Sequence, residues 1–387
     1  MDANATTPLL PEVFEAMRPF LLEQFGNASS IHQQGQRARS AVDKARDQVA
    51  QLLRCKASEI VFTSGGTESD NMALFGVLHP GDHLITTTIE HHAVLHAAEA
   101  LEKRGVEVTF LACDEAGLVS AETMTAALRP NTRLVSIMLA NNETGTMQPV
   151  AELAQIAKTH GSLFHTDAVQ AAGKLPLQLG LTCSIKDPSG SLKDVDLLSI
   201  SGHKMYAPQG TGILYVRRNV GLTPLLHGGM HERQRRAGTE NVAGIVALGK
   251  AAEMAREWLA GGEKAEHLAG LRDRLERTLL AQISDSGVNG AGTERTPNTT
   301  NVYFDGVDAD SLLIALDLKG LSVSAGSACS SGATEPSHVL TAMGLKRDRA
   351  RASIRFSLTR MTTAEEVDEA LEIIPAAVAR LRSMVAV

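Results

Sequence analysis

Short apolar runs alternate with helical patterns between about residues 55 and 217, and this alternation constrains the fold more than any other feature of the chain. The apolar runs at residues 59–63, 84–88, 106–113 and 134–140 are rich in aliphatic and β-branched side chains. Strands that alternate with helices are typical of a mostly parallel sheet covered by helices. The chain has 387 residues, 43% hydrophobic and 3% aromatic, so it can form a large, mainly aliphatic core.

The pattern changes after residue 239. Two helical stretches, residues 241–259 and 263–283, are separated by a glycine pair, and short strands are predicted at residues 301–304, 321–324 and 353–356. This pattern indicates a smaller C-terminal α+β domain. Residues 244–251 nearly match a phosphate-binding loop, but Ala251 stands where a metal-binding Ser or Thr is needed, and the segment has a helical pattern throughout.

Lys204 is the first candidate for a chemical role. The apolar run at residues 195–200 is followed by Ser201, Gly202 and His203, a small polar turn that leaves Lys204 at the carboxyl end of a strand. Sheets of this kind place their chemistry at that edge, and a lysine there can condense with the aldehyde of pyridoxal 5'-phosphate, or PLP. Taken alone, a solvated lysine is the commoner interpretation.

Two further segments suit the same cofactor. The turn at residues 64–66 joins a strand to a helix start at residues 67–73, and glycines with a helix N-terminus favour a phosphate group. Asp167 ends another apolar run and could keep a pyridine nitrogen protonated. Taken alone, ordinary helix capping is the commoner interpretation of the first segment and explains Asp167 equally well.

Seven ordered motifs covering nearly the whole chain resemble those of cysteine desulfurases, which are class V members of the fold-type I PLP enzymes. The motifs occupy residues 67–71, 90–94, 141–145, 166–170, 201–204, 236–241 and 327–330. The loop at residues 324–332 resembles that of the iron–sulfur cluster assembly subgroup. The resemblance implies a large PLP-binding domain with a mostly parallel seven-stranded sheet at residues 16–256. It also implies a smaller domain formed by residues 1–15 and 257–387.

The resemblance also implies roles for individual residues. Lys204 would hold PLP as a Schiff base, and Asp167 would pair with the pyridine nitrogen. The His91 ring would stack on the cofactor ring, and Gln170 would form a hydrogen bond with the phenolic oxygen. The cofactor phosphate would be held by Gly66, Thr67, Ser201 and His203. Thr239 would reach this phosphate from the second subunit of a homodimer. Asn142 would lie beside the cofactor and the substrate. Arg355 would bind the substrate carboxylate through its planar fork.

Cys329 would accept the sulfur. Its Ser, Ala and Gly neighbours offer little side chain to pack, which suits a thiol that collects sulfur at a cofactor and delivers it elsewhere. The reactive form is the thiolate, and His91 is the first candidate to take its proton. The expected reaction converts L-cysteine to L-alanine and leaves a persulfide on Cys329. An iron–sulfur scaffold protein or another sulfur acceptor would then be the partner.

Charge, apolar runs and cysteine spacing limit the partners and the cellular location that we expect. A net charge of −7 argues against general nucleic-acid binding, and no apolar run is long enough to span a bilayer. The four cysteines, Cys55, Cys113, Cys183 and Cys329, show neither metal spacing nor a disulfide framework, so a reducing, cytoplasmic location is expected. His91, His92 and His96 could suggest a metal, but surface or cofactor-facing histidines fit better because no HExxH pattern occurs.

The chain departs from the family at residues 181–192, which form a longer connection than usual, and at a short N-terminal segment before the first motif. Two alternatives to the desulfurase remain. One is another enzyme on the same scaffold, such as a selenocysteine lyase or an aminotransferase-like enzyme. The other is a cofactor-binding protein without turnover. A mobile thiol at Cys329 disfavours a transaminase, whose reaction has no need of one, but does not distinguish cysteine from selenocysteine.

Overall fold

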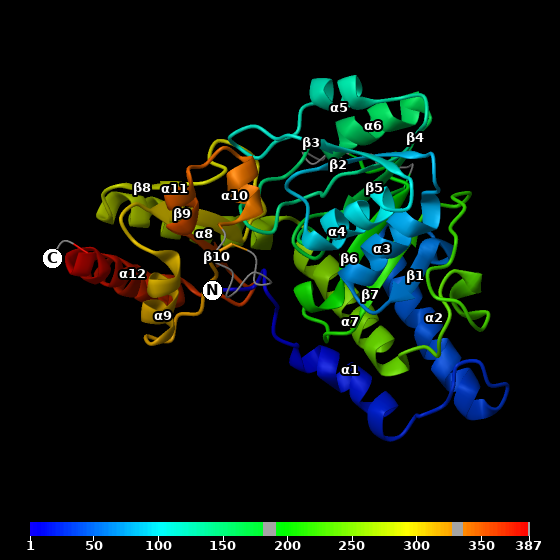
Figure 1. Ribbon diagram of the computed structural model, residues 1–387. Helices are drawn as coiled ribbons and strands as arrows, with labels where there is room; N and C mark the ends of the chain where they lie inside the picture. The colour runs from blue at the N-terminus through cyan, green and yellow to red at the C-terminus, as the bar shows by residue number, and fades with distance from the viewer. Residues whose placement is uncertain (181–190, 327–335, 386–387) are drawn as a thin grey trace.

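The computed structural model describes residues 1–180, 191–326 and 336–385. It contains a larger sheet of seven strands, seen on the right of Figure 1, and a smaller three-stranded sheet on the left. In spatial order, the larger sheet consists of β1 (Ile60–Thr63), β7 (Gly212–Val216), β6 (Leu197–Ser201), β5 (Leu163–Asp167), β4 (Thr132–Ser136), β2 (His83–Thr87) and β3 (Glu107–Leu111). Only β7 runs antiparallel to its neighbours. The predicted fold class is thus confirmed.

Helices cover both faces of the larger sheet because its strands are apolar on both sides. One face packs against α3 (Gly66–Val77) and α4 (His92–Glu102) through residues such as Leu197 and Leu214. The other packs against α2, α6 and α7 through the alternate residues, such as Leu198 and Ile213. The remaining helices up to residue 259 are α1 (Pro11–Leu22), α2 (Gln33–Leu53), α5 (Ala121–Ala127), α6 (Val150–His160) and α7 (Val242–Leu259).

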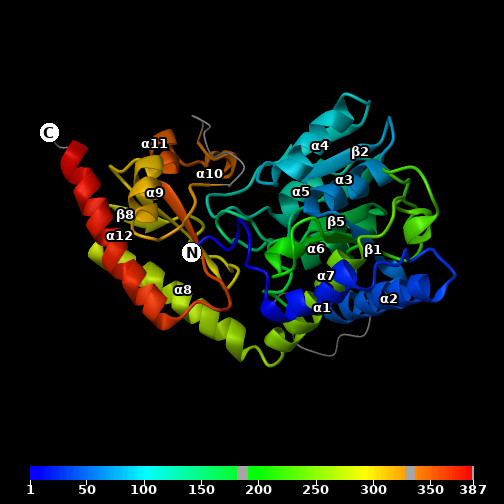
Figure 2. The same cartoon turned by 90° about the horizontal axis from the view of Figure 1, so that it is seen from below.

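The smaller sheet has the order β10-β9-β8 and is antiparallel. Its strands are β8 (Ser286–Val288), β9 (Thr299–Phe304) and β10 (Ser353–Ser357). The helices around it are α8 (Glu263–Gln282), α9 (Ala309–Asp317), α10 (His338–Ala342), α11 (Arg347–Arg351) and α12 (Ala364–Val385). Figure 2 shows α8 and α12 side by side, and both contribute to a second apolar core. The division of the chain at residues 16 and 257 stays a prediction.

Two details of the smaller sheet differ from expectation. The strand predicted at residues 321–324 is wrong, because only Ser324 pairs there, through an isolated bridge to Arg355. The short strand β8 was not predicted, since three residues that include Gly287 make no recognisable pattern. The near-match to a phosphate loop at residues 244–251 lies inside α7, in agreement with its helical pattern. In the described part of the chain, no helix combines the length and apolar character that a membrane span requires.

The N-terminal segment runs between the two sheets, where Figure 1 marks the N-terminus. Asn4 is buried there and joins both sides. Its side-chain nitrogen donates to the Asn142 main-chain oxygen at 3.2 Å and to Thr299 Oγ1 at 2.9 Å, and its own oxygen accepts from Asn298 Nδ2 at 3.0 Å. Its main-chain nitrogen donates to Ser357 Oγ at 3.0 Å. One residue near the start of the chain therefore ties the smaller sheet to the edge of the larger one.

Candidate active site

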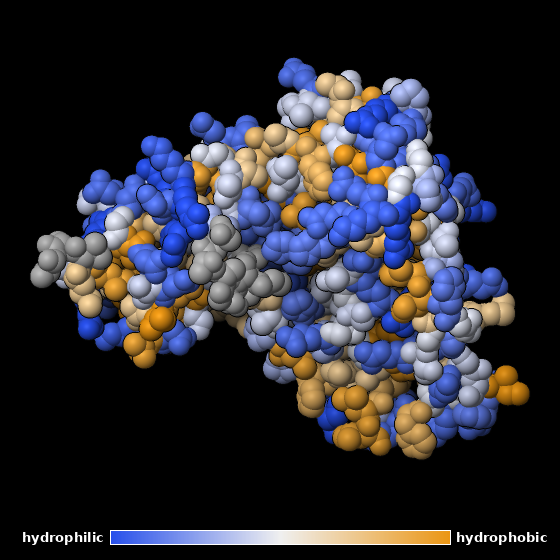
Figure 3. Space-filling model, viewed as in Figure 1, coloured by the Kyte–Doolittle hydropathy of each residue, from blue (hydrophilic) through white to orange (hydrophobic). Residues whose placement is uncertain are grey.

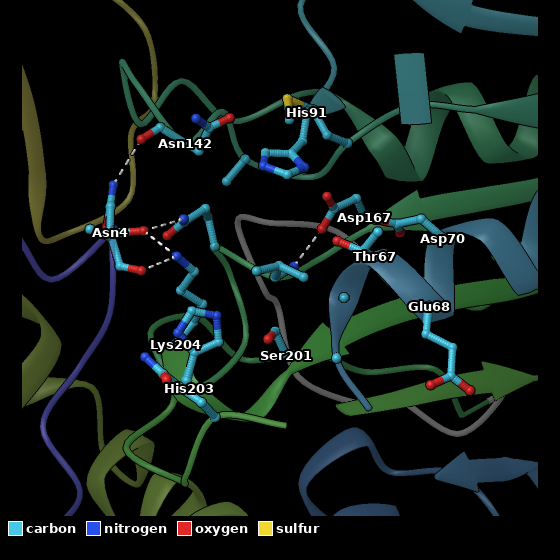
Figure 4. A pocket seen from close by; sticks show the side chains of 18 of the residues that line it. Asn4, Thr67, Glu68, Asp70, His91, Asn142, Asp167, Ser201, His203 and Lys204 are labelled. Carbon is cyan, nitrogen blue, oxygen red and sulfur yellow. Dashed lines mark hydrogen bonds between the residues drawn. The ribbon is translucent and has the colours of Figure 1, made fainter. Parts of the chain in front are cut away.

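A cavity of about 450 Å³ opens at the carboxyl ends of β5 and β6, where an α/β sheet is expected to place a ligand. Distant parts of the chain line it, namely the N-terminal segment and the turns after several strands of the larger sheet, which Figure 4 shows, together with β10. Most of the predicted site residues meet here: Gly66, Thr67, His91, Asn142, Asp167, Gln170, Ser201, His203, Lys204 and Arg355. Thr239 and Cys329 are the two predicted residues that are not among them.

Lys204 is held at the cavity by the turn after β6. Ser201 ends the strand, and residues Gly202–Lys204 form one short 3-10 turn, η2. Within this turn Gly202 leaves no room for a side chain, because a Cβ would lie 2.3 Å from Thr211 Oγ1. The Lys204 amine donates to the main-chain oxygens of Asn4 at 2.6 Å and Ala5 at 2.5 Å, as Figure 4 shows. The sequence-based placement of Lys204 after a strand is confirmed.

Asp167 ends β5 and faces the same cavity. Its Oδ1 accepts a hydrogen bond from the Val169 main-chain N–H at 2.8 Å, which fixes the carboxylate. Burial raises the pKa of Asp167 to about 6, while the Val169 N–H and the Lys204 charge act in the opposite direction. The group is therefore mostly ionised at pH 7 and can pair with a cation.

Asp70 is a second buried carboxyl beside Asp167, which sequence reasoning did not find. It lies in α3 and is only 1% exposed, and burial, followed by the charge of Asp167, raises its pKa well above the usual value. Two close carboxylates away from water cannot both ionise cheaply, so one proton is retained. Asp70 is the group that holds it, which leaves the negative charge on Asp167, at the cavity. Nothing distinguishes Asp70 in sequence from an ordinary polar residue of a helix.

The turn at residues 64–66 and the start of α3 form one wall of the cavity. Gly66 begins the helix, and a Cβ there would lie 2.9 Å from Val169 Cγ2, so only glycine allows this close packing. The unpaired main-chain N–H groups of a helix's first turn attract an anion. Ser201 and His203 lie close by on the turn after β6 (Figure 4). These features suit a phosphate group, as the sequence predicted.

His91 caps α4 and lines the cavity. Its Nδ1 accepts from the Ala93 main-chain N–H at 3.1 Å, so the proton of the neutral ring must lie on Nε2. Burial lowers the pKa of His91 to about 4, and the nearby His92 and Lys204 add to this effect. The imidazole is therefore neutral at pH 7, which suits stacking on an aromatic ring, while its one lone pair is engaged by the Ala93 N–H. His92 and His96 follow on the same helix with their rings stacked at 5.0 Å.

Arg355 projects from β10 and is only 1% exposed. Its Nη1 donates to the Asn142 main-chain oxygen at 3.0 Å, and its Nη2 donates to Asp2 Oδ1 at 2.9 Å. Arg355 Nε and Asn142 Oδ1 are buried without a hydrogen-bond partner among the described residues. A fixed guanidinium beside unpaired polar atoms is suited to bind a small carboxylate.

Thr239 and Cys329, the two other predicted residues, are not among the described residues that line the cavity. Thr239 is exposed and does not line the cavity of its own chain. Cys329 lies outside the described residues. The described residues on either side of its segment both approach Glu143: Ser337 Oγ donates to Glu143 Oε2 at 2.5 Å, and a Cβ built on Gly326 would lie 3.3 Å from the same oxygen. Glu143 follows Asn142, so both ends of the segment meet the chain beside the cavity.

Comparison with known proteins agrees with this site. Residues 1–370 match the family model of the class V aminotransferases, "Aminotransferase class-V". The chain is 48% identical to the cysteine desulfurase IscS of Methanosarcina thermophila over 99% of its own length and 93% of the relative. It is 49% identical to a cysteine desulfurase of Trichormus azollae over 99% and 94%. A solved NifS-like protein superposes with a TM-score of 0.87 at 38% identity, covering 98% of this chain and 99% of that one. The chain therefore belongs to the class V aminotransferase family, in its cysteine desulfurase branch.

Proposed function

We propose that this protein is a PLP-dependent cysteine desulfurase that converts L-cysteine to L-alanine and transfers the sulfur to Cys329. The observation that carries the proposal is the convergence of Lys204, Asp167 and Arg355 on one cavity, the first two from the ends of two strands of the larger sheet and the third from within β10 of the smaller sheet. The amine can hold the PLP aldehyde carbon, the carboxylate can pair with the pyridine nitrogen, and the guanidinium can bind the carboxylate of an amino-acid substrate. The curated relatives with this activity support the same conclusion.

The residues of the cavity fit PLP. Lys204 would hold its aldehyde carbon, Asp167 its pyridine nitrogen and Gln170 its phenolic oxygen, with the His91 ring stacked on the face. Gly66, Thr67, Ser201 and His203 would surround the phosphate. The unpaired donor Arg355 Nε and the main-chain N–H groups at the start of α3 are what such a ligand and its substrate would use. When bound, PLP supplies an electron sink that makes the Cα–H bond of an amino acid acidic.

The chain's own residues would perform the remaining steps. Arg355 and Asn142 would hold the substrate carboxylate, and the Lys204 amine would take the proton from Cα. The Cys329 thiolate would attack the substrate sulfur, so that a new S–S bond forms as the C–S bond breaks. The electron pair of that bond would stay on the three-carbon fragment, which takes up protons at Cβ and Cα and leaves as L-alanine. His91 would accept the thiol proton at Nδ1 after that atom releases the Ala93 N–H, because Nε2 already carries the proton of the neutral ring.

A homodimer would complete the site, because Thr239 is exposed and could reach the cavity of a second copy. Figure 3 shows apolar side chains gathered over α1 at the bottom of the view. The large apolar residues exposed in and after this helix are Phe14, Leu21, Leu22, Phe25 and Ile31. Such a patch is typical of an interface between protein chains. An iron–sulfur scaffold protein or another protein thiol would receive the sulfur from Cys329.

The experiment is an intact-mass measurement of the PLP-loaded protein after addition of L-cysteine without reductant. The wild type should gain the mass of sulfur and release L-alanine. Cys329→Ala should gain no sulfur, and Cys113→Ala, which removes a half-buried cysteine, should behave as the wild type. A wild type that stays unmodified while PLP is bound would contradict the proposal.

Gly212→Ala should weaken PLP binding roughly tenfold, because the close approach of β7 to the phosphate turn leaves no room for a side chain. A Cβ at Gly212 would lie 2.6 Å from Gly65 Cα and would push this turn out of place. The measurement is a PLP titration followed by visible absorption. Gly221→Ala is the matched control, since a Cβ there meets nothing within 4 Å, and it should bind PLP as the wild type does.

A further inference from the structure

Lys174 is a buried lysine to which the proposed reaction gives no role. It lies in the turn after β5, four residues beyond Gln170, and is only 7% exposed. No carboxylate pairs with its amine among the residues that the structure describes. A lysine buried without an ion partner loses the hydration of its amine, so hydrogen bonds to the protein must offset this loss.

Both acceptors of the Lys174 amine belong to Gln170. Nζ donates to the Gln170 main-chain oxygen at 3.0 Å and to its side-chain Oε1 at 2.9 Å. An ammonium group can only donate, so the Gln170 amide must turn its oxygen to Lys174 and its nitrogen the other way. Gln170 Nε2 donates to the Asn4 main-chain oxygen at 3.1 Å, and this same oxygen receives the Lys204 amine at 2.6 Å.

We propose that Lys174 is a positioning residue, which fixes the Gln170 amide so that its N–H group, and not its oxygen, faces the cofactor. The inference rests on the proposed PLP site and adds to it a side chain that, together with the Asn4 main-chain oxygen, sets the direction of the phenolic-oxygen contact. A flipped amide would present an oxygen to the phenolic oxygen and repel it. With the amide fixed, the phenolic oxygen receives a hydrogen bond and becomes a weaker acceptor for the proton carried by Lys204.

The surroundings of Lys174 hold this geometry. Gly173, with φ +74°, makes the sharp turn before it, and a Cβ there would lie 2.5 Å from Met205 Cγ, so the turn packs closely against the segment after Lys204. Burial, with the charges of Lys204 and Arg355, lowers the pKa of Lys174 to about 7. A neutral amine keeps two N–H groups, which is the number its two acceptors require, so the contact to Gln170 Oε1 can persist in both charge states.

The test compares Lys174→Met, Gln170→Ala and the double variant in two measurements on purified protein. The first is PLP affinity from an absorption titration, and the second is the pH at which the visible absorption of bound PLP changes. Lys174→Met should bind PLP roughly tenfold or more weakly, as expected for a lost hydrogen bond to a charged group. Its absorption change should move to higher pH, because both the fixed donor and a nearby cation are gone.

The double variant isolates the path of the effect. If Lys174 acts through Gln170, Lys174→Met should change PLP affinity little in a chain that already carries Gln170→Ala. Equal effects in both backgrounds would overturn the proposal, and so would a Lys174→Met protein with wild-type affinity and pH dependence. Lys250→Met, which removes a lysine paired with Glu253 on α7, is the control and should match the wild type.

Folding and the proposed function are separated by two further measurements. Thermal unfolding without PLP shows whether Lys174→Met is folded. If it is not, Lys174→Gln, whose amide also donates, replaces it and should show the same shifts at smaller size. A wild type that binds no PLP would contradict the proposed function itself. If the wild type binds PLP, and a folded Lys174 variant shows the same PLP affinity and the same pH dependence, only the role of Lys174 would be contradicted.

Discussion

Lys204→Ala should lower the rate of alanine formation from L-cysteine by roughly 10³-fold or more, because it removes both the group that holds the cofactor and the base that takes the Cα proton. The amine already points into the cavity, where two main-chain oxygens accept its protons. The fold should persist, because the Asn4 main-chain oxygen still accepts a hydrogen bond from Gln170 Nε2, and water can replace the Lys204 amine at both oxygens.

Reduction with borohydride gives a readout independent of turnover. In the wild type it should fix PLP covalently on the peptide that contains Lys204, and in Lys204→Ala it should fix none. A small primary amine such as methylamine should restore part of the rate to the variant. Covalent labelling at another lysine, Lys174 included, would show that Lys204 is not the attachment site.

Asp167→Asn should lower kcat by roughly 10²- to 10³-fold, because an amide cannot stabilise a protonated pyridine nitrogen through charge. The matched control is Asp70→Asn. Burial and the charge of Asp167 raise the pKa of Asp70 well above its usual value, so the proton that this close pair retains lies on Asp70, and its replacement by a neutral amide should leave kcat within a few-fold of the wild type. Equal losses in the two variants would contradict the assignment of the charge to Asp167.

The same pair of variants predicts the pH dependence of stability. Asp167 has a folded-state pKa of about 6, above its value of 3.8 in the unfolded chain. The folded protein without PLP therefore binds this proton more tightly, and the cost of ionising the group is present above pH 6 and disappears as the pH falls below 4. Asp167→Asn without PLP should accordingly unfold at a higher temperature than the wild type at pH 8. The gain should vanish in acid.

The sequence predicts the parts of the site that follow a strand. Lys204 and Asp167 each come after a short apolar run, and parallel strands bring such ends to one edge, so their proximity could be expected. Arg355 could be assigned only through the resemblance, because it lies within a strand of a different sheet. The order of the motifs along the chain assigned a role to Arg355, which the periodicity of apolar residues does not reveal.

Other parts of the site give no local signal. Asn4 reaches Lys204 across 200 positions of sequence, and a segment without helix or strand has no pattern to place it. Lys174 resembles a surface lysine until its turn is seen to be buried. The strand expected at residues 321–324 failed for a related reason: local β propensity is suitable, but only Ser324 meets a partner strand.

The position of Asn4 also bears on how the molecule forms during synthesis. Its partners Asn298, Thr299 and Ser357 lie 294, 295 and 353 positions later in the chain. The larger sheet and the helices that cover it end at residue 259, so they can fold while the ribosome is still translating. Asn4, in contrast, cannot make these contacts until residues up to 357 have emerged. The wall that Asn4 contributes to the cavity therefore forms later than the larger sheet does.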